Sequence, residues 1–294
     1  MKSRILTDAQ AIAFSNHLLH EEKSPATRGK YLRDVRRFYV FVGSQPISKE
    51  TVILWKRHLM DTGYAVRSIN SMLASVNSLL TFLGWHDCRV KSIRLQRQAY
   101  CTKDAELTRA EYVRLLEASR SDLQLSLILQ TICSTGIRVS ELQYFTVAAV
   151  RNGEITVNCK NKIRTILIPG KLRKMLLGYA RQMHLGSGPI FLNKYGAPLD
   201  RSTVWRKMKH LCAAAHVAES KVFPHNLRHL FACMYYTNEK DLSRLADILG
   251  HSSIDTTRIY TSVSGDEQQQ QIESLGLVVE RKKLPHDIHY AVKK

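Results

Sequence analysis

The sequence predicts a mainly α-helical protein with one small antiparallel sheet, an α+β fold arranged as two domains. Apolar residues recur at helical spacing along most of the chain, which is typical of amphipathic helices. One stretch instead has two short β-branched runs close together, which indicates a strand, a turn and a second strand. The length of 294 residues favours two domains, each large enough to bury its own core.

The first predicted domain, residues 1–95, has the pattern of a small helical bundle. Ser24 is a typical N-cap, because Pro25 follows it at the first helical position, where the N–H that proline lacks has no helical partner. Gly43 ends that helix. The four predicted helices occupy about 7–22, 24–43, 48–62 and 67–84. A bundle of this size leaves little room for a catalytic cleft.

The second predicted domain, residues 105–276, lies between a basic linker at 96–104 and a tail at 277–294. The linker falls where the helical periodicity stops and lysine and arginine become frequent. The tail follows a glycine and begins with apolar residues, so we expect it to dock on a neighbouring subunit.

The elements of the second domain can be placed from capping and strand signals. Thr108 and Glu111 have the spacing of a capping box at a helix start. The runs Glu154–Val157 and Arg164–Ile168 predict the two strands. Helices are predicted at 108–119, at 122–134 and, apart from a loop at 186–199, from 170 to about 275.

The charge balance points to a polyanionic partner. There are 44 lysine and arginine residues against 25 acidic ones, a formal net charge of +19, which favours nucleic acid first and an acidic membrane surface second. No apolar run approaches the roughly 18 residues of a membrane span, and Asp8 interrupts any signal-peptide core. The six cysteines form no CxxC pair, which argues against a zinc ribbon or a disulfide framework and favours a cytoplasmic protein.

Five short motifs in the second domain combine cationic side chains, histidines and a tyrosine. In chain order they are TGIRVSEL (135–142), the basic hairpin tip 160–164, HNLRH (225–229), Gly250-His251 and Tyr260. Within HNLRH, the first histidine, the arginine and the second histidine stand at i, i+3 and i+4, so a helix would place them on one face.

These residue types suit the breakage of a phosphodiester. Arginine binds phosphate oxygens bidentately and stays charged at every relevant pH. Histidine donates to the same phosphate or accepts the proton of a nucleophile. A lysine in a dry site protonates a leaving alkoxide, and a tyrosine becomes nucleophilic once cations favour its phenolate. The pattern predicts a phosphotyrosine bond to DNA, formed with no metal or other cofactor because arginines stabilise the transition state.

Each candidate also has an ordinary interpretation when it is taken alone. His225 and His229 have the spacing of zinc ligands, but Arg228 on the same face would repel a cation and HNLRH has no carboxylate, so we predict no metal site there. Arg138 alone would be a helix cap, and Tyr260 alone an amphipathic packing residue. The co-occurrence of all the motifs favours the catalytic interpretation.

The motifs and their order resemble the catalytic domain of the tyrosine recombinases, the phage-integrase and Xer-type family. The segment SPATRGKYLRDVRRFYVFV (24–42) is similar to the helical, SAM-like core-binding domain of that family, so the resemblance covers about residues 5–265. It implies a core-binding DNA-binding domain at 1–95, followed by the catalytic domain.

The resemblance also implies a homotetramer that cleaves and rejoins two sites in double-stranded DNA. The reaction would pass through a 3′-phosphotyrosyl intermediate and a Holliday junction, without metal or ATP. Such a protein would be cytoplasmic and nucleoid-associated.

Matching by position, the resemblance implies roles for individual residues. The implied catalytic residues are Arg138, Lys160, His225, Arg228, His251 and the nucleophile Tyr260; the implied supporting residues are Glu141, His229 and Lys162. The hairpin CKNKIR is one residue shorter than the common family pattern GKGNKxR, so Lys160 is the first choice for the general acid and Lys162 its competitor.

Two groups of polar residues in the first domain are predicted to face DNA. Charge on one helix points to phosphate contact by Arg28, Lys30 and Arg33, and the resemblance adds Arg67, Ser68 and Asn70.

Two other functions fit the catalytic motifs and the basic charge of the chain. A tyrosine-type topoisomerase would relax DNA of any sequence without a second site, and a regulator would bind DNA with an idle catalytic site. The regulator is less favoured, because a protein with an idle catalytic site would have no need to keep every one of the predicted catalytic residues.

Overall fold

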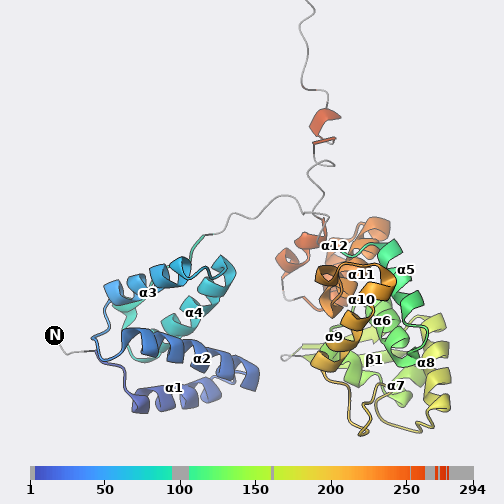
Figure 1. The fold of residues 1–294 in the computed structure, drawn as a ribbon, viewed down its shortest axis with the longest axis horizontal. Coiled ribbons are helices and arrows are strands. Elements are labelled where there is room, and N and C mark those ends of the chain that lie inside the picture. Colours follow the sequence, from blue (N-terminus) through green and yellow to red (C-terminus); the bar gives the residue numbers. More distant parts are fainter. Residues whose placement is uncertain are drawn as a thin grey trace, which may run out of the picture. The chain divides into compact units, whose positions relative to one another are not determined.

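The computed structural model describes residues 4–94, 106–159, 162–251, 253–261, 269–270, 272–275 and 277. The chain divides into two compact units, Met1–Arg97 and Gln98–Lys294. The described residues are mainly helical and carry one two-stranded antiparallel sheet, so the predicted fold class is confirmed (Figure 1). None of the helices in these ranges has the length and apolar character needed to cross a membrane.

The first unit is a bundle of helices around an apolar core. Its elements are α1 (Asp8–His20), α2 (Pro25–Val42), α3 (Lys49–Asp61), α4 (Val66–Phe82) and the 3-10 turn η1 (His86–Cys88). The Ser24 side chain accepts a hydrogen bond from the N–H of Thr27, as an N-cap should. Phe14, Phe38 and Trp55 are fully buried at the centre of the bundle, with Phe38 and Trp55 in edge contact. These contacts hold the charged face of α2 on a rigid support.

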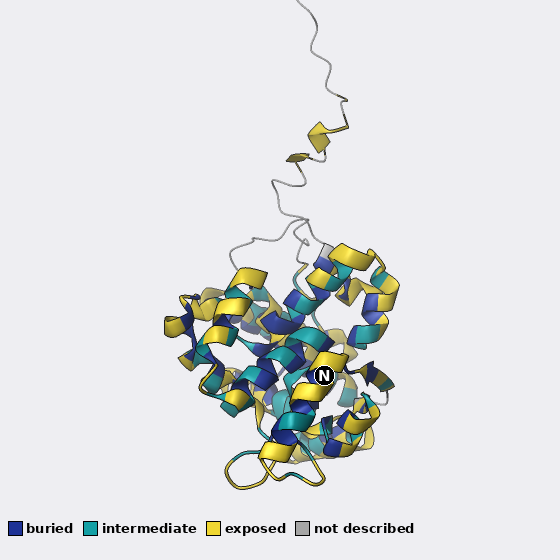
Figure 2. Cartoon of the chain, turned by 90° about the vertical axis from the view of Figure 1, so that its right-hand side faces the viewer, coloured by how far each residue is buried: buried dark blue, intermediate teal, exposed yellow. Residues whose placement is uncertain are grey.

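The second unit places a small sheet beside a larger group of helices. Its elements are α5 (Arg109–Ala118), α6 (Leu123–Thr135), η3 (Val139–Tyr144), α7 (Val147–Asn152), β1 (Glu154–Cys159), β2 (Lys162–Leu167), α8 (Gly170–Gln182), α9 (Arg201–His210), α10 (Cys212–Ala215), η4 (Glu219–Lys221), α11 (Pro224–Glu239), α12 (Leu242–Leu249), η5 (Ile254–Thr256) and η6 (Arg258–Thr261). The strands β1 and β2 pair so that Val157 lies opposite Arg164. Helix α6 packs on α11 in the interior, and buried residues follow the inward faces of the helices (Figure 2).

One part of the helical prediction is wrong. The sequence predicts helix through most of the stretch from 170 to about 275, but the described residues after Gly250 form the short 3-10 elements η5 and η6. In a 3-10 helix, residues three apart lie on the same side. That geometry buries both Thr257 and Tyr260, and the N–H of Tyr260 donates to the carbonyl of Thr257. The tighter turn therefore directs the tyrosine into the second unit.

Candidate active site

Segments from five parts of the second unit meet at one place. Arg138 precedes η3, Arg164 lies on β2, Arg228 on α11, His251 follows α12, and Tyr260 lies in η6. Arg138 and Arg164 both bond the carboxylate of Glu141, and Arg228 contacts His251 and Tyr260. Nη2 of Arg138 joins the two groups by donating to the carbonyl of Gly250, the residue before His251, at 3.5 Å. The structure thus brings the predicted residues Arg138, Arg228, His251 and Tyr260 into a single cluster, together with Arg164.

The buried carboxylate of Glu141 holds two arginines in place. Its Oε1 accepts from Nη1 of Arg138 at 3.1 Å, and its Oε2 accepts from Nη2 of Arg164 at 2.5 Å. Oε2 also accepts the backbone N–H of Arg138 at 2.8 Å, which completes a capping box at the start of η3. Glu141 is only 2% exposed, whereas the Arg138 side chain is 38% exposed. Glu141 is therefore an internal positioning group, and Arg138 presents its charge to the outside.

Arg228 is a buried cation held by the ends of two helices. Its Nη1 donates to the carbonyl of Gly136 at 2.7 Å, and its Nη2 donates to the carbonyl of Leu249 at 2.7 Å. These carbonyls stand at the C-terminal ends of α6 and α12, where the helix dipole favours a positive charge. Burial, and then the charges of Arg138 and Arg164, lower the pKa of Arg228 to about 10. At neutral pH the guanidinium remains charged.

Two glycines allow the helix ends to approach the arginines. Gly136 and Gly250 both adopt a φ of 64°, a conformation that L residues with side chains rarely take. A Cβ at Gly136 would lie 2.4 Å from the ring of Phe231, and a Cβ at Gly250 would lie 2.6 Å from Nη1 of Arg164. Any side chain at either position would displace a neighbour, so the close packing of the cluster depends on both glycines.

The protonation of His251 follows from its partners. Its Nε2 is 3.0 Å from Nη2 of Arg228, and its Nδ1 is 2.8 Å from the hydroxyl of Thr257. Arginine only donates hydrogen bonds, so Nε2 must be the acceptor and the ring proton is assigned to Nδ1. Burial, followed by the charges of Arg228 and Arg138, lowers the pKa of His251 to about 4. His251 is therefore a neutral imidazole at neutral pH.

Tyr260 lies inside this cluster in the same chain. Its side chain is 5% exposed, its ring is stacked on that of His251 with centroids 6.2 Å apart, and its ring meets that of His229 edge-on at 4.9 Å. Burial raises the pKa of the Tyr260 hydroxyl, while the charge of Arg228 and a hydrogen bond from it act in the opposite direction. A further loss of negative charge or gain of positive charge near this hydroxyl would favour the phenolate.

The two histidines of HNLRH differ in their surroundings. His225 is exposed at the start of α11, and partial desolvation followed by the charge of Arg228 lowers its pKa. His229 is mostly buried, with Nε2 3.8 Å from Oε1 of Glu106 and Nδ1 3.4 Å from the thiol of Cys233. Burial lowers the pKa of His229, and the carboxylate of Glu106 raises it in part. Although they share a face of α11, the two rings therefore have different partners.

The two candidate general acids lie at the hairpin between β1 and β2. Lys160 lies outside the described residues, and for Lys162 the structure gives the backbone in β2 but not the side chain. Their roles stay predictions. The predicted tail at 277–294 likewise lies outside the described residues, except for Leu277.

Sequence reasoning missed two residues of the cluster. Arg164 was noted as part of the basic hairpin but not as a site residue, yet its side chain is only 13% exposed and contacts Glu141. Strand alternation could have found it, since it pairs with the fully buried Val157 and shares a face with Ile166. Thr257, whose buried hydroxyl contacts His251, has no such signal, because a threonine in this position is common in loops and helix ends alike.

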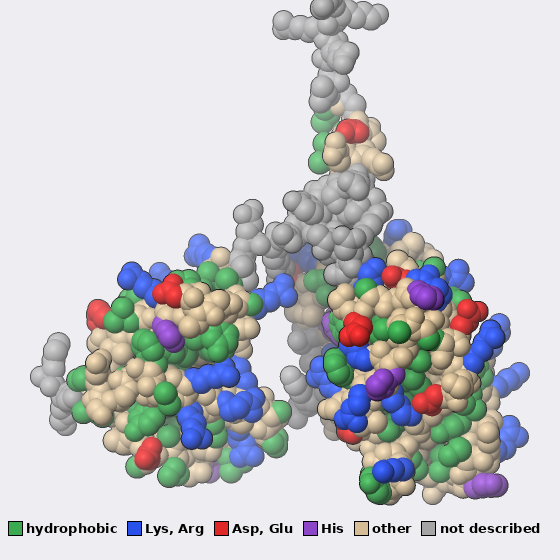
Figure 3. All heavy atoms as spheres, in the orientation of Figure 1, with side chains coloured by type: hydrophobic (Ala, Val, Ile, Leu, Met, Phe, Trp, Pro, Cys, Tyr) green, Lys and Arg blue, Asp and Glu red, His purple; other side chains and the backbone are tan. Residues whose placement is uncertain are grey.

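The predicted DNA-facing residues of the first unit fall into two kinds. Arg33, Arg67 and Ser68 are exposed, and Lys and Arg side chains gather over α2 on the face that Figure 3 shows. Lys30 is instead engaged within the unit, 2.8 Å from the carboxylate of Asp34 and 2.6 Å from the carbonyl of Ser71.

Asn70 and Arg28 also have particular surroundings in the first unit. Asn70 donates to the carbonyl of Ile93 and accepts from its N–H, both at 2.8 Å, so its amide positions the backbone at residue 93. Arg28 is half-buried, and its Nε has no hydrogen-bond partner among the described residues. An external acceptor would satisfy that group.

A mainly helical two-unit fold with a cluster of arginines, histidines and a tyrosine suits an enzyme that acts on phosphodiesters. The phage integrase family matches residues 105–267, and the N-terminal SAM-like domain of phage integrases matches residues 11–87. The chain therefore belongs to the phage integrase family and is a tyrosine recombinase, an enzyme of site-specific DNA recombination.

Known proteins share both the sequence and the fold. Tyrosine recombinase XerA of Pyrococcus furiosus is 28% identical over 288 residues, a match that covers 95% of this chain and 98% of that protein. A λ integrase dimer bound to a COC′ core site has a similar fold, with a TM-score of 0.71 and 16% identity over 96% of this chain and 99% of that one. A λ integrase tetramer bound to a Holliday junction has a TM-score of 0.70 and 17% identity, covering 87% of this chain and 77% of that chain.

Proposed function

We propose that this recombinase cleaves and rejoins DNA through a covalent 3′-phosphotyrosyl intermediate on Tyr260. The observation that carries the proposal is the position of Tyr260 in its own chain, stacked on His251 and hydrogen-bonded by Arg228. A tyrosine with only a packing role needs no such cationic partner. Glu141 is the buried carboxylate that bonds Arg138 and Arg164, while Arg228 is held by uncharged carbonyls, so positive charge is in excess where a phosphate would bind.

The cleavage step follows from these residues. The exposed side chain of Arg138 binds the non-bridging oxygens of the scissile phosphate, and Arg228 lies behind it as a fixed positive charge. The Tyr260 oxygen attacks phosphorus, and its proton passes to the neutral imidazole of His225, or to Nε2 of His251 once that nitrogen gives up its bond to Arg228. The bond to the 5′ oxygen breaks, so DNA is left with a 3′-phosphotyrosyl link and a free 5′-hydroxyl. The arginines stabilise the added negative charge of the transition state, so the step uses neither metal nor ATP.

The departing 5′ oxygen needs a proton, and we assign the donor to the β1–β2 hairpin. Lys160 is the proposed general acid, with Lys162 as the alternative. Cys159 ends β1 and pairs with Lys162 at the start of β2, so both lysines belong to the closed end of this hairpin. Arg164, two residues after Lys162, is tied to the cluster through Glu141, which anchors the hairpin at the site.

Strand exchange completes the proposed reaction. A 5′-hydroxyl from a partner strand attacks the phosphotyrosyl bond, which reverses the first step and conserves the energy of the phosphodiester. Exchange between two duplexes requires four active sites and passes through a Holliday junction. Support for a homotetramer comes from the similar fold of the λ integrase tetramer bound to such a junction. The tail at 277–294 is proposed to dock on a neighbouring subunit.

We assign DNA positioning to the first unit, which the SAM-like domain of phage integrases matches. Arg33, Arg67 and Ser68 offer exposed donors to phosphates, and Arg28 offers an Nε that has no partner within the described part of the chain. With a DNA partner, the protein would work beside the nucleoid in the cytoplasm.

A trapping experiment tests the reaction. Fragments of the DNA that flanks the chain's own gene are prepared as nicked duplexes, so that cleavage releases a short strand and traps the covalent complex. We expect a protein–DNA adduct on a denaturing gel, in the presence of EDTA, that is absent for Tyr260→Phe. An adduct that persists in Tyr260→Phe, or none on any fragment that the protein binds, would contradict the proposal. Relaxation of an unrelated supercoiled plasmid would point to a topoisomerase.

A further inference from the structure

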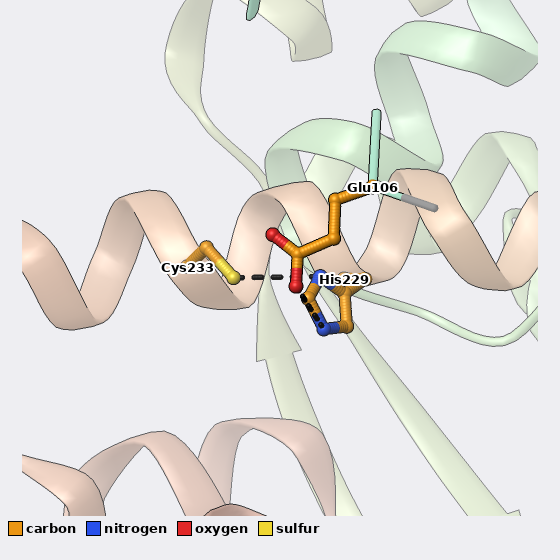
Figure 4. Close-up of side chains that lie close together, drawn as sticks. All are labelled: Glu106, His229 and Cys233. Carbon is orange, nitrogen blue, oxygen red and sulfur yellow. Dashed lines mark hydrogen bonds and ion pairs between the residues drawn. The ribbon is translucent and has the colours of Figure 1, made fainter. Parts of the chain in front are cut away.

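A thiol, an imidazole and a carboxylate meet beside the catalytic cluster. His229 and Cys233 stand four residues apart on one side of α11, and Glu106 reaches the same point from the segment before α5 (Figure 4). One ligand atom from each residue lies within 4.8 Å of the ligand atoms of the other two, and all three residues are half-buried. None of the steps proposed for the reaction uses the thiol or this carboxylate.

The three residues are held by structure around them. Glu106 is followed by Leu107, which is buried in the core of the second unit, and by Thr108, which caps α5. His229 and Cys233 share a regular helix, which fixes their spacing. The helix fixes the spacing of His229 and Cys233, and the capped start of α5 fixes the backbone next to Glu106, so metal binding needs only a side-chain rotation.

We propose that Glu106, His229 and Cys233 form a binding site for a divalent transition-metal ion of the Zn²⁺ type. A soft thiolate with an imidazole is the donor set that zinc and cobalt prefer over magnesium or calcium. The thiolate and the carboxylate neutralise the two positive charges of the ion, and the thiol proton is released to water on binding. Three protein ligands leave the fourth tetrahedral position to a water molecule.

The sulfur of Cys233 and the carboxylate of Glu106 each lie close to one ring nitrogen of His229. Zinc bonds of about 2.0–2.3 Å place tetrahedral ligand atoms roughly 3.3–3.8 Å apart. The Cys233 sulfur is 3.4 Å from Nδ1 of His229, and the Glu106 oxygen is 3.8 Å from Nε2 of the same ring. Since one ion uses one ring nitrogen, a rotation of the imidazole or of the Glu106 side chain closes the site.

Arg228 does not oppose a cation at this donor set. Within HNLRH, the repulsion by Arg228 disfavours zinc on the pair His225 and His229, which share its face. In the structure, the guanidinium of Arg228 is bonded to the ends of α6 and α12, and the exposed His225 is not part of the cluster. The carboxylate missing from the motif comes from Glu106, which is distant in sequence and could not be found from the motif alone.

A metal at this site would restrain the active site, a consequence that rests on the proposed function. The ring of His229 meets the ring of Tyr260 edge-on, with centroids 4.9 Å apart. An ion that takes a ring nitrogen of His229 ties that ring to Glu106 and so restrains the Tyr260 ring that packs against it. We therefore expect bound Zn²⁺ to slow formation of the covalent complex and its removal by a chelator to restore the rate.

Direct binding of Co²⁺, a spectroscopic substitute for zinc, tests the site without any DNA. We expect one equivalent of Co²⁺ to give a thiolate-to-cobalt charge-transfer band that Zn²⁺ displaces. Cys233→Ser should abolish the band, and Glu106→Gln should weaken binding by about 100-fold or more, since outer-shell changes alone cost roughly 10- to 100-fold. Cys133→Ser is the matched control, because Cys133 is also half-buried but bonds Tyr112 instead. That variant should keep the band.

The outcomes separate this proposal from the proposed function. Absence of a charge-transfer band, or a band that persists in Cys233→Ser, overturns the metal site whether or not Tyr260 cleaves DNA. A band with the expected variant pattern supports the site even if no covalent complex forms. Where the complex does form, Zn²⁺ should slow it in the native chain and in Cys133→Ser but not in Cys233→Ser. Should Cys233→Ser fold poorly, the partly exposed Glu106→Gln supplies the same comparison.

Discussion

Two groups of arginines, one in each unit, show how differently the same side chain can be used. On α2, Arg33, Arg36 and Arg37 are exposed, and each stands on a helix surface whose opposite side is the core. In the second unit, Arg228 is buried, and Arg164 is nearly so. Arg164 donates to the carboxylate of Glu141 and to a backbone carbonyl, and Arg228 donates to two backbone carbonyls and to His251. The first group faces solvent, and the second is built into the protein interior.

The difference has an energetic consequence. Exposed charges act on a partner nearly independently and are screened by salt. Buried charges that share Glu141 or helix-end carbonyls depend on one another, so the loss of one leaves the others without compensation. We therefore expect substitutions on α2 to change DNA affinity with little effect on folding, and substitutions in the buried group to change both folding and catalysis.

The largest effect should come from Arg228→Ala. The change leaves a cavity and removes the donor from the buried carbonyls of Gly136 and Leu249. We expect the free energy of unfolding to fall by about 3–5 kcal/mol and the covalent complex to be lost. Urea denaturation followed by circular dichroism measures the first effect, and trapping on nicked DNA measures the second.

Arg33→Ala is the matched control for that deletion. It removes the same atoms from an exposed position and should change stability by no more than about 0.5 kcal/mol. If Arg228→Ala and Arg33→Ala cost the same, then the distinction between the buried and exposed groups is wrong.

A smaller effect on the free energy of unfolding is expected from pH. The pKa of His251 is about 4 in the folded chain, against an ordinary value of 6.5. Burial is the main cause, and the nearby arginines add to it. Above about pH 6.5 the imidazole is neutral in both states, so it contributes no pH dependence. As the pH falls below this, the unfolded chain gains a proton that the folded chain does not take, so stability is lost until about pH 4.

The comparison of His251→Gln with the native chain isolates this contribution. Between about pH 7 and about pH 5 the native chain should lose about 2 kcal/mol more stability than the variant, an upper estimate for a side chain that keeps some contact with water. His225 and His229, whose pKa values are also lowered, remain in both proteins and cancel in the difference. Parallel curves for the two proteins would show that His251 does not remain neutral in the folded chain.

The contrast between the two units also explains which features could be predicted from the sequence. The helices of the first unit follow from Ser24, Pro25 and regular apolar spacing, because those signals are local. The motif residues Arg138, Arg228 and Tyr260 could be nominated from composition and order. Their burial could not, since it depends on α6, α11 and α12 meeting in space.

Long-range partners account for the other misses. Arg164 reaches the site because β2 pairs with β1, and Glu106 meets His229 across more than a hundred residues of sequence. Lys30 was predicted to contact phosphate from its charge alone, but Asp34 and Ser71 hold its ammonium group. A pattern that identifies a basic helix face does not indicate which of its charges are already paired.

The smallest change in stability, and the sharpest test of the exposed group, is Arg33→Gln. If Arg33 contacts a phosphate, the slope of log affinity against log salt for double-stranded DNA should fall in magnitude by about 1, with a weaker affinity that is similar for all sequences. Arg120→Gln removes the same charge from a side chain that is 80% exposed in the second unit. Fluorescence anisotropy of a labelled duplex over a range of salt concentrations measures both variants. If the slope of log affinity against log salt is the same for both variants, the effect comes from net charge alone. A direct phosphate contact by Arg33 releases a counterion on binding, whereas Arg120, which makes no such contact, does not.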